Sequence, residues 1–160
     1  MFKPGFRFYG FIFTVIIFLI IFIFSERNYM LVKVREKSML PTLRDGQWVL
    51  AEKKPDKVKP GDIAIFISPA DSRLAVKRCI SSGEFPLNID HGWIITPWGR
   101  WYVNGDQWER IERQGTPGKD NFFMVGDNQF NSLDSRSYGF IKKENIIGRV
   151  IAGNRHAPEQ

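Results

Sequence analysis

Residues 74–80 read Leu-Ala-Val-Lys-Arg-Cys-Ile, a short run in which aliphatic residues surround one lysine and one arginine. Runs of this length and composition are typical of β-strands. Asp-Gly, Pro-Gly, Asn-Gly and Gly-Asp turn signals separate this run from similar ones. The other runs are residues 31–34, 48–51, 63–67, 93–96, 101–104 and 122–125. The pattern predicts a mainly β domain, built as a barrel or a sandwich.

Little helix is expected beyond the N-terminal part of the chain. After residue 30, no long stretch repeats its apolar residues with a helical period. Residues 112–121 are the most loop-like stretch, and we expect them to join a small insertion back to the core. Roughly 135 residues remain after residue 25, which is enough for one domain with a core but not for two.

An uncharged apolar run of seventeen residues extends from Phe8 to Phe24. As a helix it would be about 25 Å long, which is enough to cross a bilayer. A cleaved secretory signal is the alternative, but the run lacks an Ala-x-Ala cleavage site. We therefore expect a retained anchor over residues 1–27 and a β domain over residues 28–160. More basic residues follow the run than precede it, which by counting alone would keep the C-terminal part inside, but a large folded domain can be translocated against this bias, so the charges do not fix the orientation.

The positive charge of the chain is concentrated near this run. The net charge is +6, and residues 1–60 hold eleven Lys and Arg against five Asp and Glu. Anionic lipid head groups explain this excess more simply than nucleic acid, because no nucleic-acid-binding motif accompanies it. A solvated basic face is the alternative. One cysteine, Cys79, excludes an internal disulfide, and two histidines in unrelated contexts give no support for a metal site.

Ser38 begins the hexapeptide Ser-Met-Leu-Pro-Thr-Leu, shortly after the apolar run. A serine hydroxyl becomes a strong nucleophile only when a base removes its proton, and the usual base is histidine. His91 lies in an Asp-His-Gly turn and His156 in a polar tail, so we expect both at the surface. A base for Ser38 must therefore be a lysine or a carboxylate.

Lys77 is the lysine that stands out. Alternation along residues 74–80 puts it on one face with Ala75 and Cys79, and puts Arg78 on the other face. Burial would lower its pKa from about 10.4 toward 7, at a cost of roughly 4 to 5 kcal/mol. An edge-strand lysine in water is the alternative. Because Arg78 faces the other way, we expect its replacement by alanine to be far milder than that of Lys77.

A third segment, residues 126–136, reads Gly-Asp-Asn-Gln-Phe-Asn-Ser-Leu-Asp-Ser-Arg and is dense in turn formers and polar side chains. Together with residues 38–43 and the Val-Lys-Arg of residues 76–78, it resembles the type I signal peptidases. These are membrane-anchored serine-lysine proteases that remove leader peptides from exported proteins. Framework segments at residues 60–63, 102–105 and 145–149 are also similar, so the resemblance covers most of residues 31–151 in the right order.

The resemblance implies a role for each matching residue. Ser38 matches the nucleophile, and Lys77 matches the general base that activates first this serine and then a water. Ser132 matches a hydroxyl that positions the lysine amine. Asp134 and Arg136 match an ion pair that supports the site. The implied fold is a signal-peptidase-like β-sheet catalytic domain with one N-terminal transmembrane helix.

The resemblance also implies the substrate and the compartment. Leader peptides carry small residues at the first and third positions before the cut, so shallow pockets are expected. Met39, Leu40, Leu43 and the strand at 74–80 are the predicted walls. The partners would be leader peptides of pre-proteins or pre-pilins and the lipid bilayer, without nucleic acid, cofactor or metal. The chain would cross the inner (cytoplasmic) membrane once, with its catalytic domain on the periplasmic or extracellular side.

Two departures from the family pattern stand out. Glu36 occupies the place of an auxiliary hydroxyl that helps the Ser38 N–H to stabilise the oxyanion, and a carboxylate there would repel that charge. The insertion around residues 82–120 is reduced, as in compact peptidases that process pilins for conjugative transfer.

Two other functions remain as alternatives. The first is a self-cleaving serine-lysine regulator of the DNA-damage response, against which the membrane span and the lack of a helix-turn-helix argue. The second is a catalytically silent, membrane-anchored scaffold of a secretion or conjugation apparatus, for which Glu36 is the one positive hint.

Overall fold

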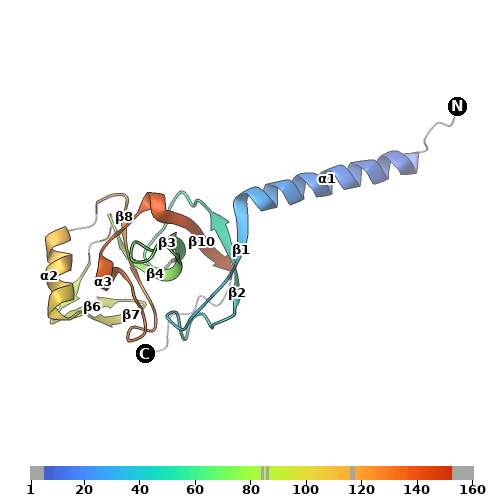
Figure 1. Ribbon diagram of the computed structural model, residues 1–160. Helices are drawn as coiled ribbons and strands as arrows, with labels where there is room; N and C mark the ends of the chain where they lie inside the picture. The colour runs from blue at the N-terminus through green and yellow to red at the C-terminus, as the bar shows by residue number, and fades with distance from the viewer. Residues whose placement is uncertain (1–5, 84, 86, 116–117, 153–160) are drawn as a thin grey trace.

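The computed structural model describes residues 6–83, 85, 87–115 and 118–152. Helix α1 (Phe6–Asn28) projects away from the rest of the protein as a single rod (Figure 1). Its apolar side chains from Phe11 to Phe24 are exposed. Its length and composition are those of a membrane-spanning helix, as the sequence predicts. His156 lies outside the described residues.

The main sheet contains seven antiparallel strands in the order β1-β2-β10-β3-β4-β8-β9. Every predicted strand run is found, with small shifts at the ends, so the mainly β prediction is confirmed. The strands are β1 (Tyr29–Lys33), β2 (Trp48–Lys53), β3 (Ile63–Ile67), β4 (Leu74–Ser82), β8 (Asn121–Val125), β9 (Ile141–Lys142) and β10 (Ile146–Ala152).

Strand β10 was not predicted. Gly148 interrupts its apolar pattern, and the pairing with β3 shifts between Ile146 and Gly148. A side chain at Gly148 would approach Met30 and the carbonyl oxygen of Glu52 on neighbouring strands. The glycine therefore marks a close approach inside the sheet, which sequence periodicity reads as a break.

A second sheet and a helix occupy the region between β4 and β8. The sheet holds β5 (Ile89–Asp90), β6 (Trp93–Thr96) and β7 (Gly99–Tyr102), and helix α2 (Gly105–Gln114) follows it. The expectation of no helix in this region was therefore wrong, because α2 is present. The expected loop at 112–121 was wrong for residues 112–114, which belong to α2. Asn104 and Gln107 form a capping box that starts α2, but Ile111 is its one buried residue. Two short helical turns, α3 (Ser135–Tyr138) and η1 (Lys143–Asn145), complete the described elements.

The milder effect expected for Arg78→Ala stays a prediction, but the surroundings of Arg78 were not predicted from the sequence. Its side chain does face away from Lys77, yet it is 1% exposed. Its guanidinium donates to both carboxylate oxygens of Asp127 at 2.8 and 2.7 Å, and to the carbonyl oxygen of Gly61 at 2.9 Å. Asp127 is also buried, so this ion pair joins β4 to the start of the loop after β8 in the protein interior.

The buried pair gives a stability prediction. Arg78→Ala removes one charge and leaves Asp127 buried without its partner, so we expect a loss of about 3 to 5 kcal/mol in the free energy of unfolding. Arg73→Ala is the matched control, because Arg73 is exposed and its contact with Asp71 is 3.9 Å long. That change should stay within about 0.5 kcal/mol. Denaturant unfolding in detergent measures the free energy of unfolding of both variants. Equal losses in the two variants would contradict the proposed contribution of the Arg78–Asp127 pair to stability.

Candidate active site

Ser38 lies on a tight turn that follows β1. The N–H of Leu40 donates to the carbonyl oxygen of Lys37, and the N–H of Leu43 donates to that of Met39 at 2.8 Å. Met39 and Leu43 are buried in the core, at 1% and 0% exposure. These two side chains fix the conformation of the turn, because another conformation would expose them to water. The hydroxyl of Ser38 is thereby held in a mostly buried position, with 8% of the residue exposed.

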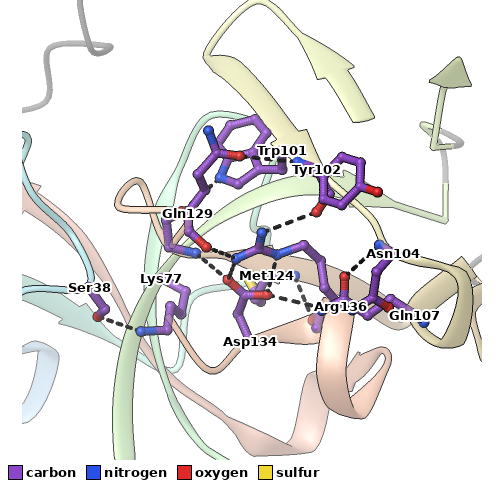
Figure 2. A network of polar contacts seen from close by, with 12 residues as sticks. Ser38, Lys77, Trp101, Tyr102, Asn104, Gln107, Met124, Gln129, Asp134 and Arg136 are labelled. Carbon is purple, nitrogen blue, oxygen red and sulfur yellow. Dashed lines mark hydrogen bonds and ion pairs between the residues drawn. The ribbon is translucent and has the colours of Figure 1, made fainter. Parts of the chain in front are cut away.

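Lys77 lies on β4 and pairs with Ala64 of β3, while the pairing of β4 with β8 begins one residue later, between Arg78 and Val125. Its side chain points toward the Ser38 turn, and its Nζ lies 2.5 Å from Ser38 Oγ as a hydrogen-bond donor (Figure 2). The residue is 6% exposed, so the alternative of an edge-strand lysine in water is wrong. Two segments that are 39 residues apart in the sequence therefore bring a hydroxyl and an amine into direct contact.

The environment of Lys77 favours the neutral amine. Burial is the main cause that lowers the pKa of Lys77 below its ordinary value, because it removes water from the ammonium form. The carboxylates of Asp134 and Glu36 oppose this shift, and the guanidinium of Arg136 adds to it. The balance is a lowered pKa, which is the condition for a lysine to act as a base near neutral pH.

Asp134 and Arg136 form the ion pair that the sequence predicts. The Nε of Arg136 donates to one carboxylate oxygen of Asp134 and an Nη to the other, both at 2.9 Å (Figure 2). Asp134 also accepts the N–H of Gly126 at 3.0 Å, and Arg136 donates to the carbonyl oxygens of Gln129 and Tyr102 at 2.8 and 3.3 Å. The pair thus holds both ends of the loop from residue 126 to 134.

Ser132 lies on that loop and lines the same cleft as Lys77 and Ser38. Its Oγ is buried and has no hydrogen-bond partner among the described residues. A buried hydroxyl without a partner calls for an explanation. The role of orienting the lysine amine, which the family resemblance implies, remains a prediction.

Sequence reasoning missed two residues that position the site. Asn128 donates from its backbone to the carbonyl oxygen of Ser38 and from its side chain to that of Lys37, each at 3.0 Å. Trp101 is buried, and its indole N–H donates to the carbonyl oxygen of Gly126 at 2.7 Å. Asn128 belongs to a motif that the sequence analysis identified, but only the structure shows that it hydrogen-bonds to the turn that carries Ser38.

A cleft of about 1190 Å³ opens beside the Ser38–Lys77 pair. Its lining includes Met39, as predicted, and residues 74–77 of β4. Leu40 and Leu43 were predicted to line it but do not. Leu43 instead belongs to the buried core. Apolar residues on and after β1, Val32 and Val34, line the cleft in their place.

Cys79 and the acidic residues offer no competing chemistry at this site. Cys79 is fully buried, and burial raises the pKa of its thiol to about 12, so it stays protonated. Within the described ranges, no group of three or more His, Cys, Asp or Glu side chains is placed to hold a metal ion.

The comparisons with known proteins agree with the motifs. The model of the family described as signal peptidase, peptidase S26, matches residues 7–84 and 101–153. A signal peptidase I of Leptolyngbya laminosa is 28% identical over 138 residues, or 74% of this chain and 64% of that protein. Signal peptidase I V of Bacillus subtilis is 29% identical over 137 residues, or 74% of this chain and 81% of that protein.

Two further similarities are to a mitochondrial protease and to a solved structure. Mitochondrial inner membrane protease subunit 1 of Saccharomyces cerevisiae is 31% identical over 135 residues, or 79% of this chain and 67% of that protein. A crystal structure of a signal peptidase I from Enterococcus faecalis aligns with a TM-score of 0.43 at 20% identity, over 61% of this chain and 98% of that one. Because the family match covers most of the sequence, this chain belongs to the signal peptidase family, peptidase S26.

Proposed function

We propose that the protein is a membrane-anchored serine endopeptidase that removes leader peptides from exported precursors with a Ser38–Lys77 dyad. The contact of 2.5 Å between Lys77 Nζ and Ser38 Oγ carries the proposal. Contact alone would be insufficient if the amine were charged, because an ammonium cannot accept a proton. The lowered pKa of Lys77 raises the fraction of the neutral amine, which can accept that proton.

The mechanism follows from this pair. The neutral amine of Lys77 takes the hydroxyl proton while Ser38 Oγ attacks the carbonyl carbon of the scissile bond. Within the described part of the chain, the N–H of Ser38 donates no hydrogen bond. It can therefore stabilise the oxyanion. The ammonium then protonates the leaving amine, and an acyl ester remains on Ser38. Lys77 next deprotonates a water, which cleaves the ester and releases the leader.

The cleft suits an extended peptide. Among the described strands, β1 pairs only with β2, and β8 pairs with β4 from Arg78 onward, so residues 74–77 have one unpaired edge. The cleft is lined by both of these segments. A leader peptide lying between them as an added strand would reach Ser38 with its side chains against Met39, Val34 and Val76. These aliphatic walls favour small apolar side chains.

The location follows from the same proposal. Leader peptides are cut on the exported side, so α1 would cross the inner (cytoplasmic) membrane once and place the catalytic domain on the periplasmic or extracellular side. Relative to larger members of the family, the region between β4 and β8 is expected to be reduced here, and on this ground we infer that pre-pilins of a conjugation apparatus are a substrate class. Cleavage of a panel of pre-proteins and pre-pilins by detergent-solubilised protein distinguishes general from specialised processing.

The dyad is tested by its removal. Ser38→Ala and Lys77→Ala should each lower leader cleavage by at least about 10³-fold while the protein stays folded and membrane-bound, because the two groups act as one unit. Arg113→Ala, an exposed change on α2 outside the cleft lining, should cleave normally. A chelator and a thiol reagent should leave the wild-type rate unchanged. Near-normal cleavage by Lys77→Ala would show that the base is another group.

Glu36 gives a test with a gain of activity. It is exposed, and its carboxylate raises the pKa of Lys77. Glu36→Gln and Glu36→Ser both remove this charge, so the pKa of Lys77 should fall further. Because activity rises with pH as Lys77 loses its proton, the acid limb of the rate profile should move to lower pH in both variants.

Glu36→Ser also adds a hydroxyl near the oxyanion. We expect roughly a tenfold gain in turnover for Glu36→Ser and a smaller gain for Glu36→Gln. Turnover of one peptide, measured from about pH 5 to about pH 10, gives both the shift of the acid limb and the gain in turnover. A clear fall in activity for Glu36→Ser would refute the placement of this side chain, and no cleavage by any variant would favour the scaffold.

Gly126 tests the packing behind the dyad. A Cβ at this position would overlap Ser132 Oγ and would lie 2.6 Å from the carbonyl oxygen of Ser38. Gly126→Ala must therefore displace the Ser38 turn or the Ser132 loop, and we expect at least a tenfold loss of turnover with a stability cost of about 1 to 3 kcal/mol. Gly105→Ala is the control, since a Cβ there meets nothing within 4 Å. Unchanged turnover in Gly126→Ala would mean that the site tolerates this displacement.

A further inference from the structure

A second cavity, of about 460 Å³, lies where α1 joins the domain. Met30, which lines it, comes two residues after the end of α1 at Asn28. Lys53, also in the lining, donates from its Nζ to the carbonyl oxygen of Glu26 in the last turn of α1, at 2.5 Å. The cavity therefore adjoins the C-terminal end of the helix.

The length of α1 sets the depth of this cavity relative to a bilayer. Its 23 residues span about 34 Å, which is slightly more than the roughly 30 Å of the hydrocarbon layer. The last turn of the helix must then reach the head-group region, and the cavity beside it lies at the same depth. A cavity at this depth meets lipid phosphates and the upper parts of acyl chains.

The lining matches both parts of a lipid. Its floor is apolar and consists of Met30, Pro55, Ile146 and Ile147. Its rim carries three lysines, at positions 53, 54 and 143, against the carboxylates of Asp56 and Glu144. Glu144 also lies 3.8 Å from the amine of Lys142, so its charge is shared with a further cation. The rim is therefore net positive above an apolar floor.

The backbone of Lys54 is also unusual. Its φ of +45° lies in the left-handed region, which lysine seldom adopts and which glycine or asparagine would fill more easily. The N–H of Lys54 donates to the carbonyl oxygen of Ile147 at 2.9 Å and ties this conformation to β10. Residue 54 thus keeps a lysine at the cavity rim despite an unfavourable backbone conformation, which points to a use for its charge.

We propose that this cavity binds one anionic phospholipid, with the phosphate between the amines of Lys54 and Lys143 and the start of an acyl chain over Met30 and Ile147. The proposal rests on α1 as a membrane span and not on peptidase activity. It has a consequence for the cleft, because β1 lines the cavity with Met30 and the cleft with Val32. A bound lipid would therefore orient the strand along which a leader peptide is proposed to lie.

Photolabelling of the full chain tests the site. The protein is placed in phosphatidylcholine nanodiscs that contain a small fraction of phosphatidylglycerol with a photoreactive group at the start of one acyl chain. Mass spectrometry then locates the label. We expect label on Met30 and Ile147, at least about fivefold more than with the matching phosphatidylcholine probe, because each lysine near a lipid phosphate contributes about this factor.

Two double variants complete the test. Lys54→Gln with Lys143→Gln should lower phosphatidylglycerol labelling in the cavity at least tenfold, and Lys143→Gln alone about fivefold. Arg110→Gln with Lys119→Gln removes the same charge from exposed residues in and after α2, which lies on the far side of the domain from α1 (Figure 1), and should change nothing. Melting temperatures check that each variant is folded.

Three results would overturn the proposal. Equal labelling by the two probes would mean that the cavity does not recognise the head-group charge. Label on α1 without label on Met30 or Ile147 would place the lipid elsewhere. Unchanged labelling in the Lys54 and Lys143 double variant would show that these amines do not bind the phosphate.

Discussion

The amine of Lys77, buried beside the hydroxyl of Ser38, is the interaction on which the site depends. Burying a lysine is costly, because its ammonium form loses water that few protein groups can replace. The fold accepts this cost at one position of β4, where pairing with Ala64 of β3 holds the backbone and β8 pairs from the next residue, Arg78, onward. A flexible or exposed lysine would keep its ordinary pKa and would remain protonated. The rigidity of the sheet is therefore part of the chemistry.

The ion pair of Asp134 and Arg136 stabilises this arrangement in two ways. Asp134 accepts hydrogen bonds from the N–H of Gly126 and from the side chain of Arg136, so it closes the loop that carries Ser132. It is also a buried negative charge near Lys77, and alone it would raise the pKa of the amine. The guanidinium of Arg136 offsets part of that effect. The loop is thus held by a carboxylate whose charge is partly compensated.

Much of this could be predicted from the sequence, and the failures have physical causes. The strand runs were visible because alternation and turn residues act locally, whereas the motifs around Ser38, Lys77 and Asp134 were identified by their resemblance to a family. Helix α2 was missed because Ile111 is its single buried residue. The burial of Arg78 was not predicted, because alternation tells which face a side chain takes but not what covers that face. Asp127, its partner, comes 49 residues later in the chain.

Direct titration of Lys77 tests the central claim most sharply. The protein can be labelled with ¹³C at the lysine Cε, reconstituted in detergent micelles and followed by NMR against pH, with Lys77→Arg used to assign the resonance. The account predicts one lysine resonance that titrates at lower pH than those of the exposed lysines and that is absent in the variant. If the Lys77 resonance titrates together with the exposed lysines, the amine is protonated at working pH and the dyad as described here is wrong.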